Sequence, residues 1–236
     1  MILLRSFLFA LGQWLFTPIF STLSLLTFPL PPITRYRIIS LWAKSILWWL
    51  ELTCSIRYRI VGAENIPQQP CVILSKHQSA WETLAFQKIF PPQVWVLKRE
   101  LLWVPFFGWG LALTSPIAID RSAGREALKQ LVAQGRDRLK KGFWVVVFPE
   151  GTRIDPGQRG KYHIGGAWLA THASALALPV AHNAGEFWGK NSFLKKPGVI
   201  TVSVGPAIDT SGMKADQLNH LVEAWIEGEM QRLHSK

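Results

Sequence analysis

The segment CVILSKHQSAWETLAFQKIF, residues 71–90, joins an apolar run to a stretch with helical spacing through a short polar loop. An apolar run that ends at a turn is typical of a buried strand, whereas apolar residues three and four positions apart are typical of a helix. The same alternation continues along residues 55–236. We therefore expect an α/β fold with a mixed, largely parallel sheet flanked by helices.

Seven strands and four helices are expected in this part of the chain. The strands are expected at residues 56–61, 71–75, 94–97, 116–119, 143–148, 178–181 and 199–204. The helices are expected at residues 80–89, 124–140, 164–175 and 215–233. The evident boundary lies near residue 54, so the sequence predicts N-terminal membrane helices in residues 1–54 and an α/β domain in residues 55–236.

The first thirty residues are nearly all apolar. A bilayer span takes about 20 residues, whereas the core of a signal peptide takes about 7–15, so residues 1–30 are long enough to cross a membrane. A second apolar segment at residues 38–52 is short for a span, which favours an interfacial helix or the second arm of a hairpin in one leaflet. The alternative for residues 1–30 is a buried core helix, although such helices usually show a polar face.

The overall balance of charge and apolarity favours a lipid partner over nucleic acid. The 236 residues carry a formal net charge of +11, and 49% of them are apolar, with 12 Trp among them. Basic charge attracts polyanions, and Trp favours membrane interfaces. Arg35, Arg37 and Lys44 follow the first apolar segment, so we expect the α/β domain on the cytoplasmic side. Cys54 and Cys71 have no metal-ligand spacing, and neither a metal site nor a disulfide framework is expected.

The loop after residue 75 carries the first candidate site. In α/β folds, sites lie outside the carboxyl ends of the strands, where His77 falls. With Glu82 in the first helical turn, its carboxylate can meet the imidazole, fix its tautomer and support His77 as a general base. The alternative is a helix-capping box over SAWE, residues 79–82, in which Glu82 only bonds back to the main chain.

The second candidate site is FPEGTR, residues 148–153, which also follows an apolar run. Pro149 marks the exit from the strand, and Gly151 allows a tight turn. Glu150 and Arg153 project from the same loop, and the planar guanidinium of Arg suits a phosphate because it gives two parallel hydrogen bonds. The alternative is a surface turn with a local ion pair.

Together, the two segments resemble the glycerolipid acyltransferase family, and within it the 1-acylglycerol-3-phosphate acyltransferases of bacterial phospholipid synthesis. The resemblance covers about residues 55–210. The His-x4-Asp block of the family is similar to residues 77–82, with Glu82 at the acidic position and Lys76 where Asn is frequent. FPEGTR matches the family block at every position. KREL at 98–101, IAIDR at 117–121 and LPV at 178–180 resemble three further blocks.

The resemblance implies direct acyl transfer from acyl-CoA or acyl-carrier protein, a co-substrate rather than a cofactor, to the 2-hydroxyl of lysophosphatidic acid. The product is phosphatidic acid. His77 with Glu82 is implied to activate the hydroxyl, Glu150 to help position the glycerol, and three cations to hold the phosphate. The implied substrate-binding residues are Lys98, Arg121, Glu150, Gly151, Thr152 and Arg153. The implied location is the bacterial inner membrane, which holds the lipid substrate.

The sequence leaves three alternative functions open. The acceptor could be glycerol 3-phosphate, another lysophospholipid or a lipid A precursor. A hydrolase would use water as acceptor, but the Gly-x-Ser-x-Gly elbow that such enzymes usually carry is missing from the sequence. A non-catalytic membrane-binding relative is the third alternative, which the replacement of Asp by Glu82 mildly favours and the intact FPEGTR block opposes.

Overall fold

The fold is that of a computed structural model that describes residues 1–120 and 124–234. Its strands are β1 (Ile56–Val61), β2 (Val72–Ser75), β3 (Gln93–Lys98), β4 (Ile117–Ile119), β5 (Trp144–Val147), β6 (Ala177–His182) and β7 (Gly198–Val204). Within the described residues they form one sheet in the order β1-β7-β6-β2-β5-β3-β4. Every neighbouring pair is parallel except β6 and β7. The prediction of a mixed, largely parallel sheet is confirmed.

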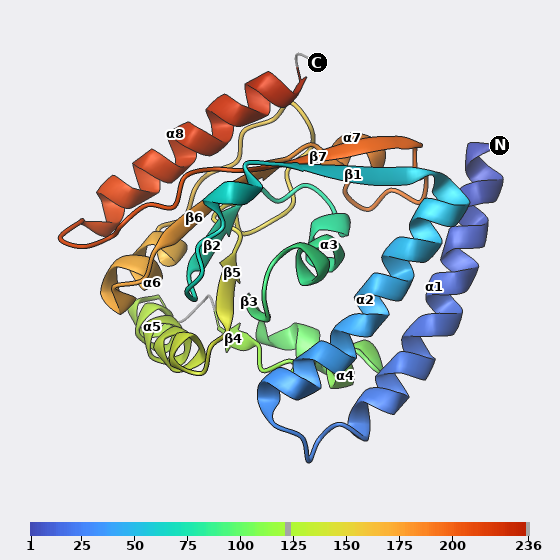
Figure 1. The fold of residues 1–236 in the computed structure, drawn as a ribbon, viewed down its shortest axis with the longest axis horizontal. Coiled ribbons are helices and arrows are strands. Elements are labelled where there is room, and N and C mark those ends of the chain that lie inside the picture. Colours follow the sequence, from blue (N-terminus) through green and yellow to red (C-terminus); the bar gives the residue numbers. More distant parts are fainter. Residues whose placement is uncertain (121–123, 235–236) are drawn as a thin grey trace.

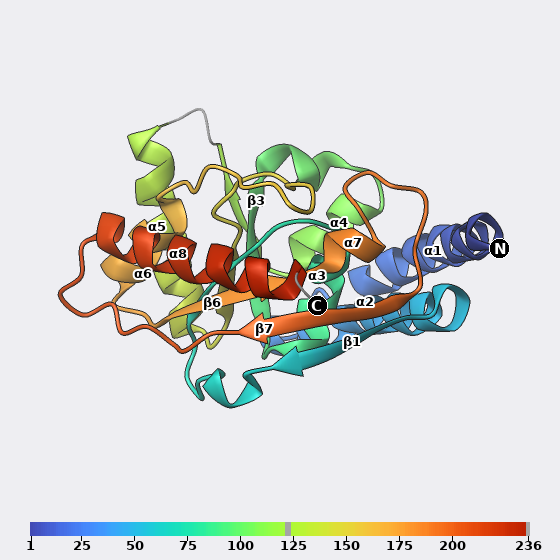
Figure 2. The same cartoon turned by 90° about the horizontal axis from the view of Figure 1, so that it is seen from above.

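Helices cover both faces of this sheet (Figures 1 and 2). They are α1 (Ile2–Leu25), α2 (Pro32–Cys54), α3 (Trp81–Ile89), α4 (Phe107–Leu113), α5 (Arg125–Lys140), α6 (Gly165–Ala173), α7 (Ala184–Phe187) and α8 (Ala215–His234). Two 3-10 turns, η1 (Ala63–Asn65) and η2 (Arg99–Trp103), complete the described elements. The pair α1 and α2 lies on one side with α3, whereas α5, α6 and α8 lie on the other.

The central strands divide their side chains between two hydrophobic cores. Ile73 of β2 and Val146 of β5 pack into the core that includes α2 and α3. Val72 and Leu74 of β2 and Val145 of β5 pack into the core that includes α5, α6 and α8. Successive side chains of a strand point to opposite faces, so apolar residues at every position are what a sheet covered on both faces requires.

Strand register brings the two candidate loops to the same edge of the sheet. In the parallel pair β2 and β5, Leu74 lies opposite Val147. In the parallel pair β3 and β4, Lys98 lies opposite Ile119. Parallel strands end at one edge, so the residues after β2 and after β5 leave the sheet side by side.

The N-terminal helices form an antiparallel pair (Figure 1). Trp49 of α2 donates its indole N–H to the carbonyl of Leu8 in α1, at 3.1 Å. Gly12 permits this approach, because a Cβ there would lie 2.0 Å from Nε1 of Trp49. The structure thus extends the second apolar segment, predicted at residues 38–52, to a helix of 23 residues.

Helix α1 is apolar and mostly uncovered. Among the described residues, it is the one helix long and apolar enough to cross a membrane, and 17% of its most apolar stretch is buried. That exposure contradicts the buried-core alternative. Both ends of α1 nevertheless contact the α/β domain: Lys195 donates its main-chain N–H to Ser6 Oγ at 2.9 Å, and Ser21 Oγ donates to the carbonyl of Phe106.

Helix α4 is the longest element that the sequence patterns did not predict. Its segment contains Pro105, Gly108 and Gly110, which are poor helix formers and obscure the helical period. Gly108 fits because the main chain turns closely there: a Cβ would lie 2.3 Å from the carbonyl oxygen of Leu102. The helix packs against α1 and η2.

Candidate active site

His77 lies in the loop between β2 and α3, opposite the carboxylate of Glu82 in the first turn of α3. Nδ1 of His77 and Oε1 of Glu82 are 2.8 Å apart. Burial by itself would raise the pKa of Glu82, but the imidazoles of His182 and His77 and the amide of Ser79 outweigh it and lower that pKa. An ionised Glu82 accepts the proton on Nδ1, which leaves Nε2 as the basic nitrogen of His77.

The same carboxylate oxygen also caps the helix. Oε1 of Glu82 accepts the main-chain N–H of Gln78 at 2.9 Å and that of Ser79 at 2.8 Å. The N-cap is Ala80 rather than Ser79, whose Oγ instead accepts the N–H of Trp81 at 3.1 Å. The contact with His77 and the bond back to the main chain were alternatives in the sequence, and the structure contains both contacts, while the catalytic role of the pair stays a prediction.

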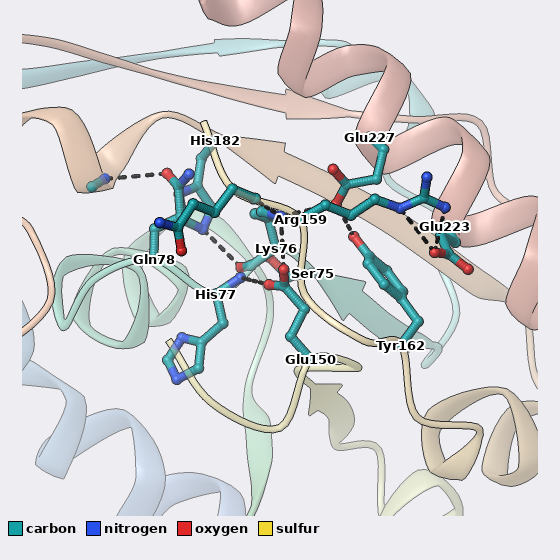
Figure 3. Close-up of polar contacts among 12 residues, drawn as sticks. Ser75, Lys76, His77, Gln78, Glu150, Arg159, Tyr162, His182, Glu223 and Glu227 are labelled. Carbon is teal, nitrogen blue, oxygen red and sulfur yellow. Dashed lines mark hydrogen bonds and ion pairs between the residues drawn. The ribbon is translucent and has the colours of Figure 1, made fainter. Parts of the chain in front are cut away.

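The FPEGTR loop and the residue that follows it hold His77 at three points. The main-chain N–H of His77 donates to Oε2 of Glu150 at 2.9 Å (Figure 3). The N–H of Ile154 donates to the carbonyl of His77 at 2.8 Å. The imidazole stacks on Phe148, with ring centroids 3.9 Å apart and planes 10° apart. Both polar groups of the His77 main chain and one face of its ring are therefore fixed by this second loop.

A second histidine supports the loop from behind. His182, at the end of β6, is fully buried. Its Nε2 donates to the carbonyl of Lys76 at 2.9 Å, and its Nδ1 accepts the N–H of Ala184 at 3.3 Å. Burial lowers the pKa of His182, and the two bonds place a proton on Nε2. The spacing of the histidines in the sequence offered no sign of this contact.

His77 forms part of the wall of a cavity of about 910 Å³. Lys98, Thr152, Arg153 and Lys190 also line the cavity and contribute polar and basic groups to its wall. The apolar part draws on α1 and α2 as well as on the α/β domain, through Phe20, Ile39, Trp42, Leu84, Trp95, Leu111, Leu128 and Leu131. Such a lining suits a ligand with an anionic group and a long hydrocarbon chain.

The family model for Acyltransferase matches residues 57–183, which include both candidate loops. The chain belongs to the Acyltransferase family. A 1-acyl-sn-glycerol-3-phosphate acyltransferase of Pseudomonas aeruginosa is 50% identical over 217 residues, covering 90% of this acyltransferase and 84% of that protein. One of Saccharomyces cerevisiae is 29% identical over 186 residues, covering 74% of this chain and 59% of that protein.

A solved structure shares the fold of this acyltransferase. The crystal structure of the 1-acyl-sn-glycerophosphate acyltransferase PlsC from Thermotoga maritima superposes with a TM-score of 0.83. It covers all of this chain and 97% of that chain, at 19% sequence identity. The superposition covers the N-terminal helices, so this acyltransferase and PlsC share the complete architecture, the helix pair included.

The expected substrate-binding residues of this acyltransferase fall into three groups. Lys98, Gly151, Thr152 and Arg153 line the cavity with His77. Glu150 is buried beneath His77 with both carboxylate oxygens already hydrogen-bonded. Arg121 lies outside the described residues. Binding of substrate by any of them stays a prediction.

Besides the contact of His182, sequence reasoning missed two lysines of this site. Lys190, in the loop after α7, shares the cavity wall with Arg153. Lys76 is buried and pairs with Glu150 and with Glu227 of α8. The unusual Lys before His77 was a visible signal for the second, but its partner on α8 is 151 residues away in the chain.

Proposed function

We propose that this acyltransferase transfers a fatty acyl group from acyl-CoA or acyl-carrier protein to the 2-hydroxyl of 1-acylglycerol 3-phosphate, forming phosphatidic acid for phospholipid biosynthesis. The observation that carries the proposal is His77, paired with the buried Glu82, in the wall of a cavity lined by both cations and apolar side chains. A general base acts on a hydroxyl, cations bind an anion, and an apolar wall binds a hydrocarbon chain. The two substrates supply all three: the 2-hydroxyl, the phosphate and the acyl chains.

The reaction follows from the orientation of the dyad. Nε2 of His77 accepts the hydroxyl proton while the hydroxyl oxygen attacks the thioester carbonyl carbon. The tetrahedral intermediate collapses by breaking the C–S bond, and the departing thiolate takes the proton from the imidazolium. Glu82 stabilises the imidazolium between these steps, because its ionised oxygen faces Nδ1 at 2.8 Å. Every step uses only the two substrates and these side chains.

Cations at the cavity wall would select the phosphate. Arg153 and Lys98 line the cavity beside His77, and Arg presents a planar fork that matches a phosphate. Arg121 joins them by resemblance to the family, and Gly151 and Thr152 contribute the adjoining loop. The hydrogen bonds of Glu150 favour a role in holding His77 over the expected contact with glycerol.

The helix pair would seat the enzyme on a membrane. Exposed apolar side chains along α1 form a large patch, with Leu4, Leu11, Trp14 and Leu15 among them. A patch of this kind marks an interaction surface. Because both ends of α1 contact the α/β domain, the geometry favours a hairpin that lies in one leaflet over one that crosses the bilayer. Basic residues after α1 favour the cytoplasmic face of a bacterial inner membrane.

An acceptor panel tests the proposal. Purified protein in mixed micelles is given an acyl-CoA, or separately an acyl-carrier protein, and thiol release is followed with each acceptor. We expect release with 1-acylglycerol 3-phosphate. Little release is expected with monoacylglycerol, which lacks the phosphate, or with glycerol 3-phosphate, which lacks the acyl chain. The two donors are compared at equal concentration to rank them.

Two results would contradict the proposal. Equal turnover of monoacylglycerol would remove the role assigned to the cations. Thiol release without any acceptor, at the rate seen with the lysophospholipid, would identify a hydrolase. Preference for glycerol 3-phosphate or for a different lysophospholipid would keep acyl transfer and replace the acceptor.

A further inference from the structure

Lys76 precedes His77, and its side chain is almost completely buried, with 1% exposed. A buried ammonium group is costly unless it is paired and hydrogen-bonded. Lys76 Nζ lies 2.7 Å from Oε1 of Glu150, 2.9 Å from Oε1 of Glu227 and 3.4 Å from the carbonyl oxygen of Gln158 (Figure 3). An ammonium group has three N–H donors, so each one has an acceptor here.

The pairing continues to the main chain of His77. Oε1 of Glu150 accepts a hydrogen bond from Lys76, which leaves Oε2 to accept the N–H of His77 at 2.9 Å. The side chain of Glu150 is fully buried, with no exposed surface. A carboxylate held at one oxygen by a buried ammonium group has little freedom to rotate. The position of Lys76 therefore determines where Glu150 holds His77.

Glu227 anchors this arrangement from α8. Oε1 of Glu227 accepts a hydrogen bond from Lys76. The same oxygen accepts a hydrogen bond from the hydroxyl of Tyr162 at 2.8 Å. Burial, together with the charges of Glu150 and Glu227, raises the pKa of Tyr162, so its hydroxyl remains a donor. Helix α8 lies beyond residues 57–183, which the family model matches. A segment outside the matched region thus reaches the loop of His77 through the half-buried Glu227 and the buried Lys76.

We propose that Lys76 and Glu227 are positioning residues of the acyl transfer. Glu227 fixes Lys76, Lys76 fixes Glu150, and Glu150 holds the main chain of His77 so that its imidazole meets both Glu82 and the acceptor hydroxyl. The proposal rests on His77 acting as the base of the proposed function. Displacement of a catalytic group by near 1 Å can cost about 10²-fold in rate, so small changes in this chain of contacts affect turnover.

The test compares three variants of α8 in the full-length protein. Glu227→Leu removes the acceptor of Lys76 and Tyr162, whereas Glu227→Gln keeps a side-chain oxygen there. Glu223→Leu is the matched control, because Glu223 lies on the same helix and pairs at 2.6 Å with Arg159, whose side chain is 65% exposed. Rates are measured well below the unfolding temperature of every variant, so that only folded protein is compared.

We expect Glu227→Leu to lower kcat by about tenfold or more while KM for both substrates changes less than about twofold. Glu227→Gln should recover most of kcat, and Glu223→Leu should match the wild type. Lys76→Met combined with Glu227→Leu should cost no more than the worse single variant, because both act through Glu150. A folded Glu227→Leu protein with wild-type kcat would overturn the proposal, as would a loss that appears only in KM.

A spectroscopic measurement separates this proposal from the choice of acceptor. In protein labelled with ¹⁵N-histidine, the Nδ1–H proton of His77 should shift or broaden in Glu227→Leu and stay in place in Glu223→Leu. An unchanged resonance in Glu227→Leu would refute positioning even if turnover falls. If the wild type prefers another acceptor, the proposed acceptor fails, and the kcat ratio measured on that acceptor still tests Glu227.

Discussion

The main-chain N–H of His77 donates to the Oε2 of Glu150 at 2.9 Å, so the loop of residues 148–153 holds the residue that we propose as the base. The return contact runs from the N–H of Ile154 to the carbonyl of His77. Two segments more than seventy residues apart in sequence therefore form one structural unit. The chemistry proposed for His77 therefore depends on both segments, whereas Arg153 of the second segment lines the cavity, where we propose that it binds the phosphate.

Arg153 is expected to select the phosphate of the acceptor. Arg153→Lys keeps the charge but loses the planar fork, so KM for 1-acylglycerol 3-phosphate should rise about tenfold while KM for acyl-CoA stays within about twofold. Steady-state kinetics with each substrate varied in turn measures both constants. An increase confined to the donor would reassign Arg153 to the thioester substrate.

Glu82 should stabilise the folded protein in a pH-dependent way. Its pKa is lowered on folding from the usual 4.5, so the stabilising contribution is complete above pH 4.5 and is lost as pH falls through the lowered value. The difference in free energy of unfolding between wild type and Glu82→Gln should therefore shrink as the pH falls below 4.5. Chemical denaturation at a series of pH values below 4.5 measures it. A difference that grows over this range would show that Glu82 is protonated in the folded protein.

The exposed face of α1 should bind lipid. Replacing Leu11 and Leu15 by Lys adds charge to an apolar surface and should weaken sedimentation with phospholipid vesicles by about tenfold or more. Leu221→Lys is the control, because Leu221 is similarly exposed on α8, on the opposite side of the molecule (Figure 1). Equal binding by both proteins would remove α1 from the membrane contact.

The sequence patterns were sufficient for the sheet because its strands follow a simple rule. Ile73 and Leu74 point to opposite faces, and each face is covered by helices, so a continuous apolar run was the expected signal. Every strand end lies within one residue of its predicted position. Phe143 and Phe148, for example, were predicted in the strand and instead flank β5. Helix α4 was missed because glycines break its pattern and tertiary contacts with α1 stabilise it.

The site was only partly predictable, for a physical reason. Pattern analysis could not choose between the dyad and the helix cap at Glu82, because one oxygen accepts bonds from both directions. The expected contact of Glu150 with glycerol came from resemblance alone. The burial of the Glu150 side chain depends on its partner Lys76, which in turn pairs with Glu227. Nothing in the local sequence indicates that residues so far apart in the chain meet.

Replacement of His77 should remove turnover without removing the fold. His77→Ala deletes the base but leaves the main-chain bonds to Glu150 and Ile154, which do not need the side chain. We expect kcat to fall by about 10²–10⁴-fold, the usual contribution of a general base, with little change in unfolding temperature. Thermal unfolding and thiol release, measured on the same preparation, provide the comparison. Turnover near the wild-type rate would exclude His77 as the base.

The most direct test of the dyad is the kcat of Glu82→Gln in folded protein. Gln can still accept the amides of Gln78 and Ser79 and so keeps the cap, but it cannot stabilise an imidazolium by charge. If Glu82 is the partner of His77 in catalysis, kcat should fall by about 10²-fold or more, whereas Glu82→Asp should keep part of it. A Glu82→Gln protein that turns over at nearly the wild-type rate would contradict the dyad and leave Glu82 as a helix cap.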